Sequence, residues 1–132
     1  MMTTFFGVDA RNDRAFIEHD MIALDKTRES EARLLNTFRG IQAEDVIFLK
    51  DFTPQSGLKV KAVGISLSSF ASEDDWEIRF PVKWIWSGEK FIDQANEELA
   101  LCGDALYEEH NILVQREILD MLPSKFQIPT PL

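Results

Sequence analysis

The stretch Trp76–Trp86 reads WEIRFPVKWIW, and its alternation indicates the fold class. Every even position is large and apolar, whereas the odd positions are Glu77, Arg79, Pro81, Lys83 and Ile85. A period of two over eleven residues is typical of a β-strand with one buried face. Because Pro81 has no N–H to donate, we expect the strand to bend or to form a sheet edge there. Ser87-Gly88 predicts a turn after it.

Further strands are predicted before this stretch. Residues 3–8 are aromatic and β-branched, and Met21–Leu24 is a short apolar run. Asp45–Asp51 has a continuous apolar centre, and Leu58–Leu67 begins with clear alternation. Residues 53–57 (TPQSG) carry a proline and a glycine, so a turn is expected between these last two strands, which then pair.

Three stretches have helical spacing. They are residues 27–38, 93–103 and 111–122, and Pro123 ends the last of them. Five or six strands with two or three helices that do not strictly alternate predict an α+β protein, a small bent β-barrel with flanking helices. Because there is no repeat and no linker, residues 1–132 are expected to form one domain, with 123–132 as an extended C-terminal tail.

The composition limits the function. Hydrophobic residues make up 45% and charged residues 28% of the chain, which is the range of ordinary globular proteins. The formal net charge of -9 excludes a uniformly basic nucleic-acid binder. The charge is uneven, because residues 1–66 hold ten acids and nine bases, whereas residues 67–132 hold 13 acids and five bases. Nearly all of the acidic excess therefore follows Ser66, and the first part is compatible with a neutral or basic surface.

No catalytic motif is present. Cys102 is the single cysteine and the two histidines have no metal-ligand spacing, so neither a disulfide nor a zinc site is expected. Neither a phosphate-binding glycine loop nor a nucleophile elbow occurs. We therefore expect a protein that is not an enzyme and that uses no metal or cofactor. Because no signal peptide and no long apolar run is found, we expect a cytoplasmic protein without a membrane partner.

All three tryptophans lie within Trp76–Trp86. They can form one wall of the core, or one or two of them can line a pocket that stacks a planar ligand such as a nucleobase. Trp76 is assigned to the core, whereas both alternatives stay open for Trp84 and Trp86. The lysines on the polar faces of the strands are candidates either for phosphate contact or for an ordinary solvated sheet face.

Three short motifs occur in order in the middle of the chain. After the helix predicted at 27–38 come Ala43–Lys50 (AEDVIFLK), Leu58–Ile65 (LKVKAVGI) and, beyond an acidic gap, Arg79–Trp84 (RFPVKW). This order resembles the PUA-like superfamily, especially the EVE-like domains, which show G-D-x-V, A-x-G-x-V and V-x-W. The resemblance covers about residues 34–86, and Glu44 stands where the family has glycine.

The resemblance implies a bent barrel that binds nucleic acid without catalysis and recognises a modified or flipped base in an aromatic pocket. Trp84 matches the strand tryptophan of the family, and residues 62–66 are implied to lie beside it. The candidates for the base pocket are Trp84, Trp86, Ala62, Gly64 and Ser66. The candidates for phosphate contact are Lys50, Lys59, Lys61 and Lys83.

The acidic second part of the chain supports a different hypothesis, in which the barrel is the scaffold of a protein-interaction module. The candidates for an acidic face are Glu73, Asp74, Asp75 and Glu77. Such a face would dock a basic protein, in the manner of a DNA mimic or an inhibitor. The sequence alone does not decide between nucleic acid and a basic protein as the partner, and it gives no oligomeric state.

Overall fold

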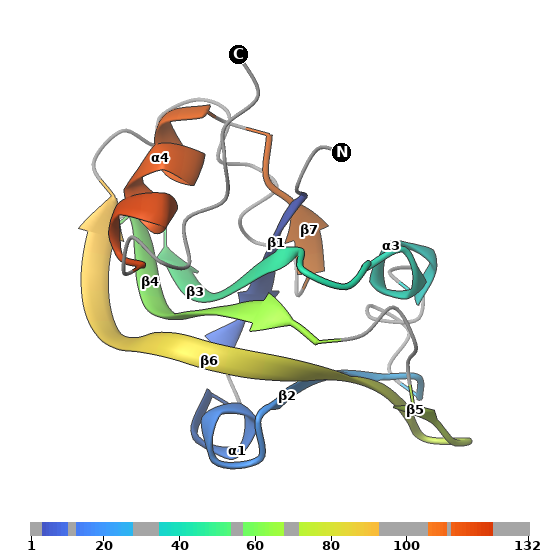
Figure 1. Ribbon diagram of the computed structural model, residues 1–132. Coiled ribbons are helices and arrows are strands. Elements are labelled where there is room, and N and C mark those ends of the chain that lie inside the picture. Colours follow the sequence, from blue (N-terminus) through green and yellow to red (C-terminus); the bar gives the residue numbers. More distant parts are fainter. Residues whose placement is uncertain are drawn as a thin grey trace.

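The structure, a computed structural model, describes residues 4–10, 13–27, 35–53, 57–67, 72–92, 106–110 and 112–122. Within these ranges the chain forms seven strands and three helices (Figure 1). In chain order they are β1 (Phe5–Asp9), α1 (Asp13–Glu18), β2 (Met21–Asp25), α3 (Leu35–Arg39), β3 (Val46–Thr53), β4 (Gly57–Ser66), β5 (Ser72–Glu73), β6 (Glu77–Ile92), β7 (Leu106–Glu108) and α4 (Ile112–Asp120).

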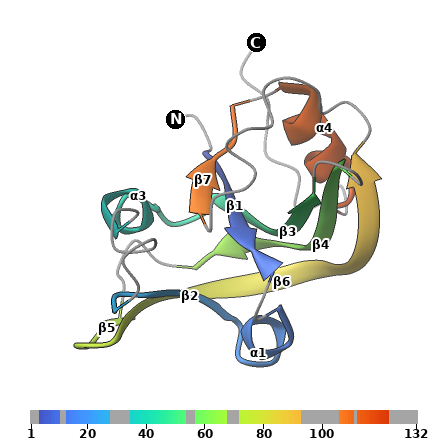
Figure 2. The same ribbon diagram turned by 180° about the vertical axis from the view of Figure 1, so that it is seen from behind.

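The strands belong to one mixed sheet that curls into a half-barrel (Figures 1 and 2). The strand order is β2-β6-β4-β3-β1-β7, and the short β5 pairs with β6 beside this path. β1 runs parallel to β3, whereas the other neighbouring strands are antiparallel. The 16 residues of β6 pair first with β2 and β5 and then with β4. β6 therefore joins the two parts of the curl.

Buried apolar side chains form two clusters, one on each face of the sheet. The first cluster takes residues from six strands and from α1 and α3, so it fills the inside of the curl. The second cluster lies between the outer face of β3, β4 and β6 and the helix α4, in which Val114 and Ile118 are fully buried. Each such aliphatic side chain contributes about 1.5–3 kcal/mol on burial. Because both faces of β3 are covered, its apolar run is continuous.

A bulge in β6 redirects its side chains. Gly64 pairs with Trp84 and Val63 pairs with Trp86, so Ile85 is an extra residue relative to β4. A bulge of this kind breaks the alternation of the strand. Trp84 accordingly packs against the first cluster and Trp86 against the second. The prediction of one apolar face through to Trp86 is therefore wrong beyond Trp84.

β6 also continues where the sequence predicts a turn. Ser87 and Gly88 lie inside the strand, and pairing with β4 resumes at Lys90. The ribbon of β6 bends strongly in this second part (Figure 1). A glycine within a strand allows a tight bend, so the chain changes direction here without leaving the sheet.

The turn before β3 is held by the buried carboxylate of Asp45. It accepts hydrogen bonds from the N–H of Gln42 at 2.8 Å and from the N–H of Thr4 at 3.3 Å, which ties the turn to the start of β1. Burial raises the pKa of Asp45, and the two N–H donors oppose this effect. Glu44, in the same turn, has a φ of 72°, the left-handed conformation that glycine adopts most readily.

Most of the predicted elements are present, with shifted ends. Residues 13–18 form α1, a helix that the sequence does not predict. Phe16 of α1 is buried in the first cluster, and this packing stabilises the short helix. β7 has no counterpart in the prediction. Of the helix predicted at 27–38 the structure describes α3 at its end, and residues 28–34, 93–103 and 123–132 lie outside the described residues.

The first prediction concerns the contact of β4 with β6. A Cβ at Gly64 would lie 2.5 Å from the backbone carbonyl oxygen of Lys83, which cannot turn aside. We expect Gly64→Ala to lower the free energy of unfolding, measured by urea denaturation, by about 1–3 kcal/mol. In the control Gly40→Ala, the new Cβ would come no closer than 3.3 Å to another atom, so we expect a smaller change. Equal losses in the two variants would contradict this account.

Because the pKa of Asp45 is raised, the direction in which this group changes stability with pH can be predicted. The folded state holds the Asp45 proton more tightly than the unfolded state, so this group favours folding at pH values below its ordinary pKa of 3.8. That contribution is lost as the pH rises through the folded-state pKa. We therefore expect the free energy of unfolding, relative to that of Asp45→Asn, to be larger at about pH 4 than at about pH 7.

Urea denaturation of both proteins at the two pH values measures this difference. If the free energy of unfolding of the original chain, relative to that of Asp45→Asn, instead increased toward neutral pH, the two N–H donors and not burial would dominate the pKa of Asp45. Asp45→Ala leaves both donors without an acceptor, so it should cost about 1–3 kcal/mol at either pH.

Candidate functional site

Trp84 and Gly64 lie opposite each other on β6 and β4, as the resemblance implies. The Trp84 side chain is partly buried against the first cluster, and its Nε1 donates a hydrogen bond to the carbonyl oxygen of Phe16 at 2.9 Å. The indole is therefore held between β6 and the helix α1. Its polar edge is already used within the fold, which leaves only part of the ring accessible.

The other candidates for a base pocket do not surround an accessible space with Trp84. Ala62, Gly64 and Ser66 are buried, and the Trp84 ring lies 2.9 Å from the position of a Cβ on Gly64. Trp86 packs against the second cluster, on the other face of the sheet. The structure thus brings Trp84 close to residues 62–66 but separates it from Trp86, because of the bulge at Ile85.

Lys50, which the sequence predicts to contact phosphate, is buried in the structure. It is only 2% exposed, and its ammonium lies 5.6 Å from the centroid of the Tyr107 ring. Residues 46–49, which precede it on β3, are buried on both faces of the sheet, and Lys50 continues this buried run although it is charged. A phosphate at the surface does not reach it in this structure.

Lys59 and Phe91 form an accessible pair at the bend of β6. They lie opposite each other on β4 and β6, and the Lys59 ammonium is 5.6 Å from the centroid of the Phe91 ring, which is 52% exposed. Lys61, which lies at a register shift of β4 against both β3 and β6, is partly exposed. We name Lys59, Lys61 and Phe91 the bend face. Lys83 is not part of it, because it pairs with Ile65, whose side chain packs against the second cluster on the other face.

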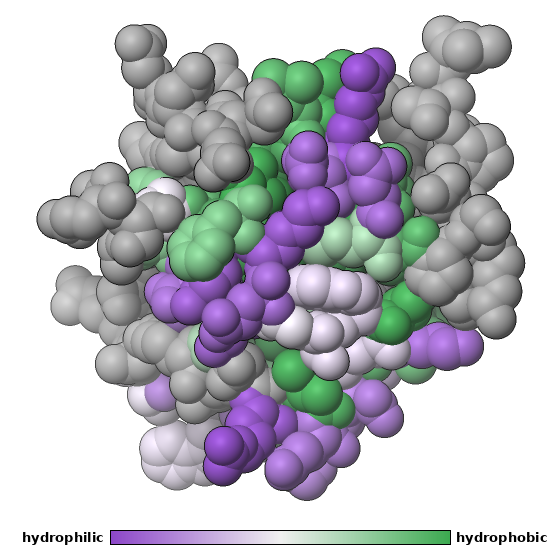
Figure 3. Space-filling view, turned by 90° about the vertical axis from the view of Figure 1, so that its left-hand side faces the viewer, coloured by the Kyte–Doolittle hydropathy of each residue, from purple (hydrophilic) through white to green (hydrophobic). Residues whose placement is uncertain are grey.

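Figure 3 views the bend of β6 from outside. Hydrophilic side chains form a diagonal band across this side of the molecule, with near-neutral and hydrophobic side chains on its flanks. The exposed carboxylate of Glu89 lies 3.7 Å from the Lys59 ammonium and offsets part of its charge. An accessible ring with an ammonium over it can stack a planar group and hold an anion next to that group.

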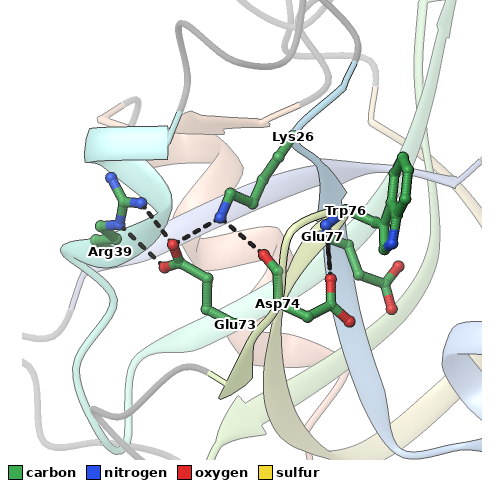
Figure 4. Close-up of polar contacts among 6 residues, drawn as sticks. All are labelled: Lys26, Arg39, Glu73, Asp74, Trp76 and Glu77. Carbon is green, nitrogen blue, oxygen red and sulfur yellow. Dashed lines mark hydrogen bonds and ion pairs between the residues drawn. The ribbon is translucent and has the colours of Figure 1, made fainter.

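The candidates for an acidic face lie in the hairpin that joins β5 and β6, which we name the acidic hairpin: Glu73, Asp74, Asp75 and Glu77. Glu73 forms ion pairs with Lys26 at 2.8 Å and with Arg39 at 3.0 Å (Figure 4). These two cations hold the pKa of Glu73 below its ordinary value. The Glu73 carboxylate, which the sequence predicts to bind a basic partner protein, is therefore already paired with cations of the chain itself.

Asp74 and Glu77 also have partners within the fold. One Asp74 oxygen accepts the N–H of Trp76 at 2.7 Å and that of Glu77 at 2.8 Å, and these bonds lower the pKa of Asp74 (Figure 4). Glu77 forms an ion pair with Arg79 at 3.3 Å. With Lys26, Arg39 and Arg79 included, the acidic hairpin carries one more acid than base, so its charge density is lower than the sequence indicates.

Trp76 is exposed, contrary to the prediction that it belongs to the core. Its exposed fraction is 70%, and it precedes the first residue of β6 that pairs with β2, which is Glu77. The alternation of the sequence continues to Trp76, but the sheet that would cover the side chain ends before it. The polar run Ser72–Asp75, directly before Trp76, is the signal that marks this position as a turn.

Comparison with models of known protein families finds no match, and no curated protein matches the chain. In the described part of the chain, no three His, Cys, Asp or Glu side chains gather in a way that could hold a metal ion. The helices among the described residues include none that is long and apolar enough to span a bilayer.

The hydrogen bond from Trp84 to α1 can be tested by substitution. Trp84→Phe keeps a ring but removes the donor for the Phe16 carbonyl, so we expect the free energy of unfolding to fall by about 1–3 kcal/mol in urea denaturation. Trp76→Phe, which changes a ring in solvent, should leave it within about 0.5 kcal/mol. A larger loss from Trp76→Phe would mean that the roles of the two tryptophans are reversed.

Proposed function

We propose that this chain is a non-catalytic module that binds nucleic acid through the bend face of a PUA-like barrel. The observation that carries the proposal is the contact of the Lys59 ammonium with the exposed Phe91 ring. A base can stack on such a ring, and the ammonium can pair with a phosphate of the same strand. The base has to be unpaired or flipped, because a base inside a duplex does not offer its face.

Two local features support the PUA-like part of the proposal. Glu44 stands where the family has glycine, and its φ of 72° is the conformation that glycine favours. Gly64 lies opposite Trp84, which is the arrangement that the resemblance implies. The curled mixed sheet is compatible with a small bent barrel.

Burial favours the bend face over a deep pocket as the place of contact. Gly64 and Ser66 are covered by the fold, whereas Phe91 presents half of its surface. The partly exposed edge of Trp84 remains a second position where a flipped or modified base can stack. Lys59 and Lys61 together neutralise about two phosphates, so the logarithm of the affinity should fall with that of the salt concentration with a slope of about -1.4. A contact of this size is compatible with a net charge of -9.

The alternative from the sequence, an acidic face that acts as a DNA mimic, receives less support. Lys26, Arg39 and Arg79 pair with carboxylates of the acidic hairpin, and a mimic of DNA needs a dense, uncompensated row of negative charge. We therefore place this function second.

The proposal predicts how single substitutions change the binding of a short labelled single-stranded oligonucleotide, followed by fluorescence anisotropy at low salt. Phe91→Ala removes the stacking surface and should weaken binding about tenfold. Lys59→Gln should reduce the salt slope by about 0.7. Glu89→Gln removes the carboxylate that competes for Lys59, so it should strengthen binding.

The matched control is Lys90→Gln. Lys90 forms an ion pair with Glu117 of α4 at 3.2 Å and lies on the face of β6 opposite to the bend face, so its loss should leave the affinity unchanged. Oligonucleotides with and without modified bases are compared in parallel. If none of them binds at low salt, or if Phe91→Ala binds as well as the original chain, the bend face is not a nucleic-acid site.

A further inference from the structure

Trp76 is the most exposed of the large hydrophobic side chains in the described structure, at 70%. A tryptophan in solvent contributes little to the fold, yet tryptophan is the residue type most enriched among energetic centres of protein interfaces. The ring points away from the contacts of Lys26, Glu73 and Arg39 (Figure 4). Among the described residues, cation–π contacts are found at Tyr107 and Phe91 but not at Trp76.

The backbone that carries Trp76 is held firmly on both sides. Its N–H is bound by the Asp74 carboxylate at 2.7 Å, and its carbonyl oxygen accepts the backbone N–H of Lys26 at 2.8 Å. The Lys26 ammonium also donates to the carbonyl oxygen of Asp74 at 2.8 Å. The ion pairs of Glu73 with Lys26 and Arg39 then fasten the hairpin to the strand β2 and the helix α3. A ring presented on a fixed backbone loses less conformational entropy when it binds.

The charge around Trp76 indicates which kind of group can bind to its ring. Glu77, on one side of it in the sequence, is paired with Arg79 at 3.3 Å, whereas Asp75, on the other side, is exposed and has no ion-pair partner among the described residues. Phosphate groups of nucleic acid or of an anionic membrane are repelled by the Asp75 carboxylate. A cation is attracted both by this carboxylate and by the face of the indole ring.

We infer that Trp76 is an anchor for an arginine or lysine side chain of a basic segment in a partner protein. The guanidinium or ammonium stacks on the indole face, and the Asp75 carboxylate balances its charge. The Lys26, Glu73 and Arg39 contacts keep the hairpin in place but do not touch the partner. This docking surface is independent of nucleic-acid binding at the bend face.

The test uses the full chain and a labelled peptide of alternating arginine and glycine, with binding followed by the anisotropy of the label. We expect Trp76→Ala to weaken binding about fivefold, and Asp75→Asn to weaken it by a smaller factor. The affinity should fall as salt is added, because the contact is exposed. Phe91→Ala, which removes the exposed ring at the other surface, is the matched control and should bind the peptide unchanged.

The urea midpoint of Trp76→Ala is measured beside its affinity, and an unchanged midpoint shows that a loss of binding is not a loss of folding. Equal affinity of the original chain and Trp76→Ala would overturn the inference. So would equal binding of a peptide of alternating glutamate and glycine. If Trp76→Ala instead lost affinity for a single-stranded oligonucleotide and kept it for the arginine peptide, the ring would serve nucleic acid and the inference would be wrong.

Discussion

The close approach of β6 to β4 at Gly64 is the constraint on which the rest of the structure depends. With no side chain at Gly64, the Lys83 carbonyl and the Trp84 ring come close to β4, and the following bulge at Ile85 sends Trp86 to the opposite face. β6 thereby contributes to the cluster inside the curl and to the cluster under α4. Because the large apolar residues of β6 occupy alternate positions, they can serve both clusters only if the alternation is broken, as it is between Trp84 and Trp86.

The sequence predicts the strands β1 to β4 and β6 and the helix α4, because alternation and helical spacing are properties of a single segment. It does not predict features that depend on how one strand pairs with another. The bulge at Ile85 is defined by register against β4, and the exposure of Trp76 follows from where pairing with β2 ends. Lys50 carries a charge, yet it is buried, with its ammonium near the Tyr107 ring of β7. In the candidate site, the resemblance implied that Trp84 lies beside residues 62–66, but it did not reveal that these residues are buried.

The acidic hairpin and the bend face differ in local charge, and the net charge of the chain does not show this difference. The acidic hairpin has the densest run of acids in the described structure, but most of these carboxylates are bound to the backbone or to cations of the chain. In the bend face, the Lys59 ammonium lies 3.7 Å from the exposed carboxylate of Glu89. A formal charge of -9 therefore describes the chain as a whole and not any one contact surface.

The position of β1 has a consequence for how the protein is made. β1 is paired on both sides, in parallel with β3 and antiparallel with β7. Both partners follow β1 in the sequence, so during synthesis its hydrogen bonds are complete only after residues 46–50 and then residues 106–108 have been made. Until β7 has been made, the side chains Phe5, Phe6 and Val8, which are buried in the fold, lack part of their cover, and apolar surface exposed in this way is prone to aggregation.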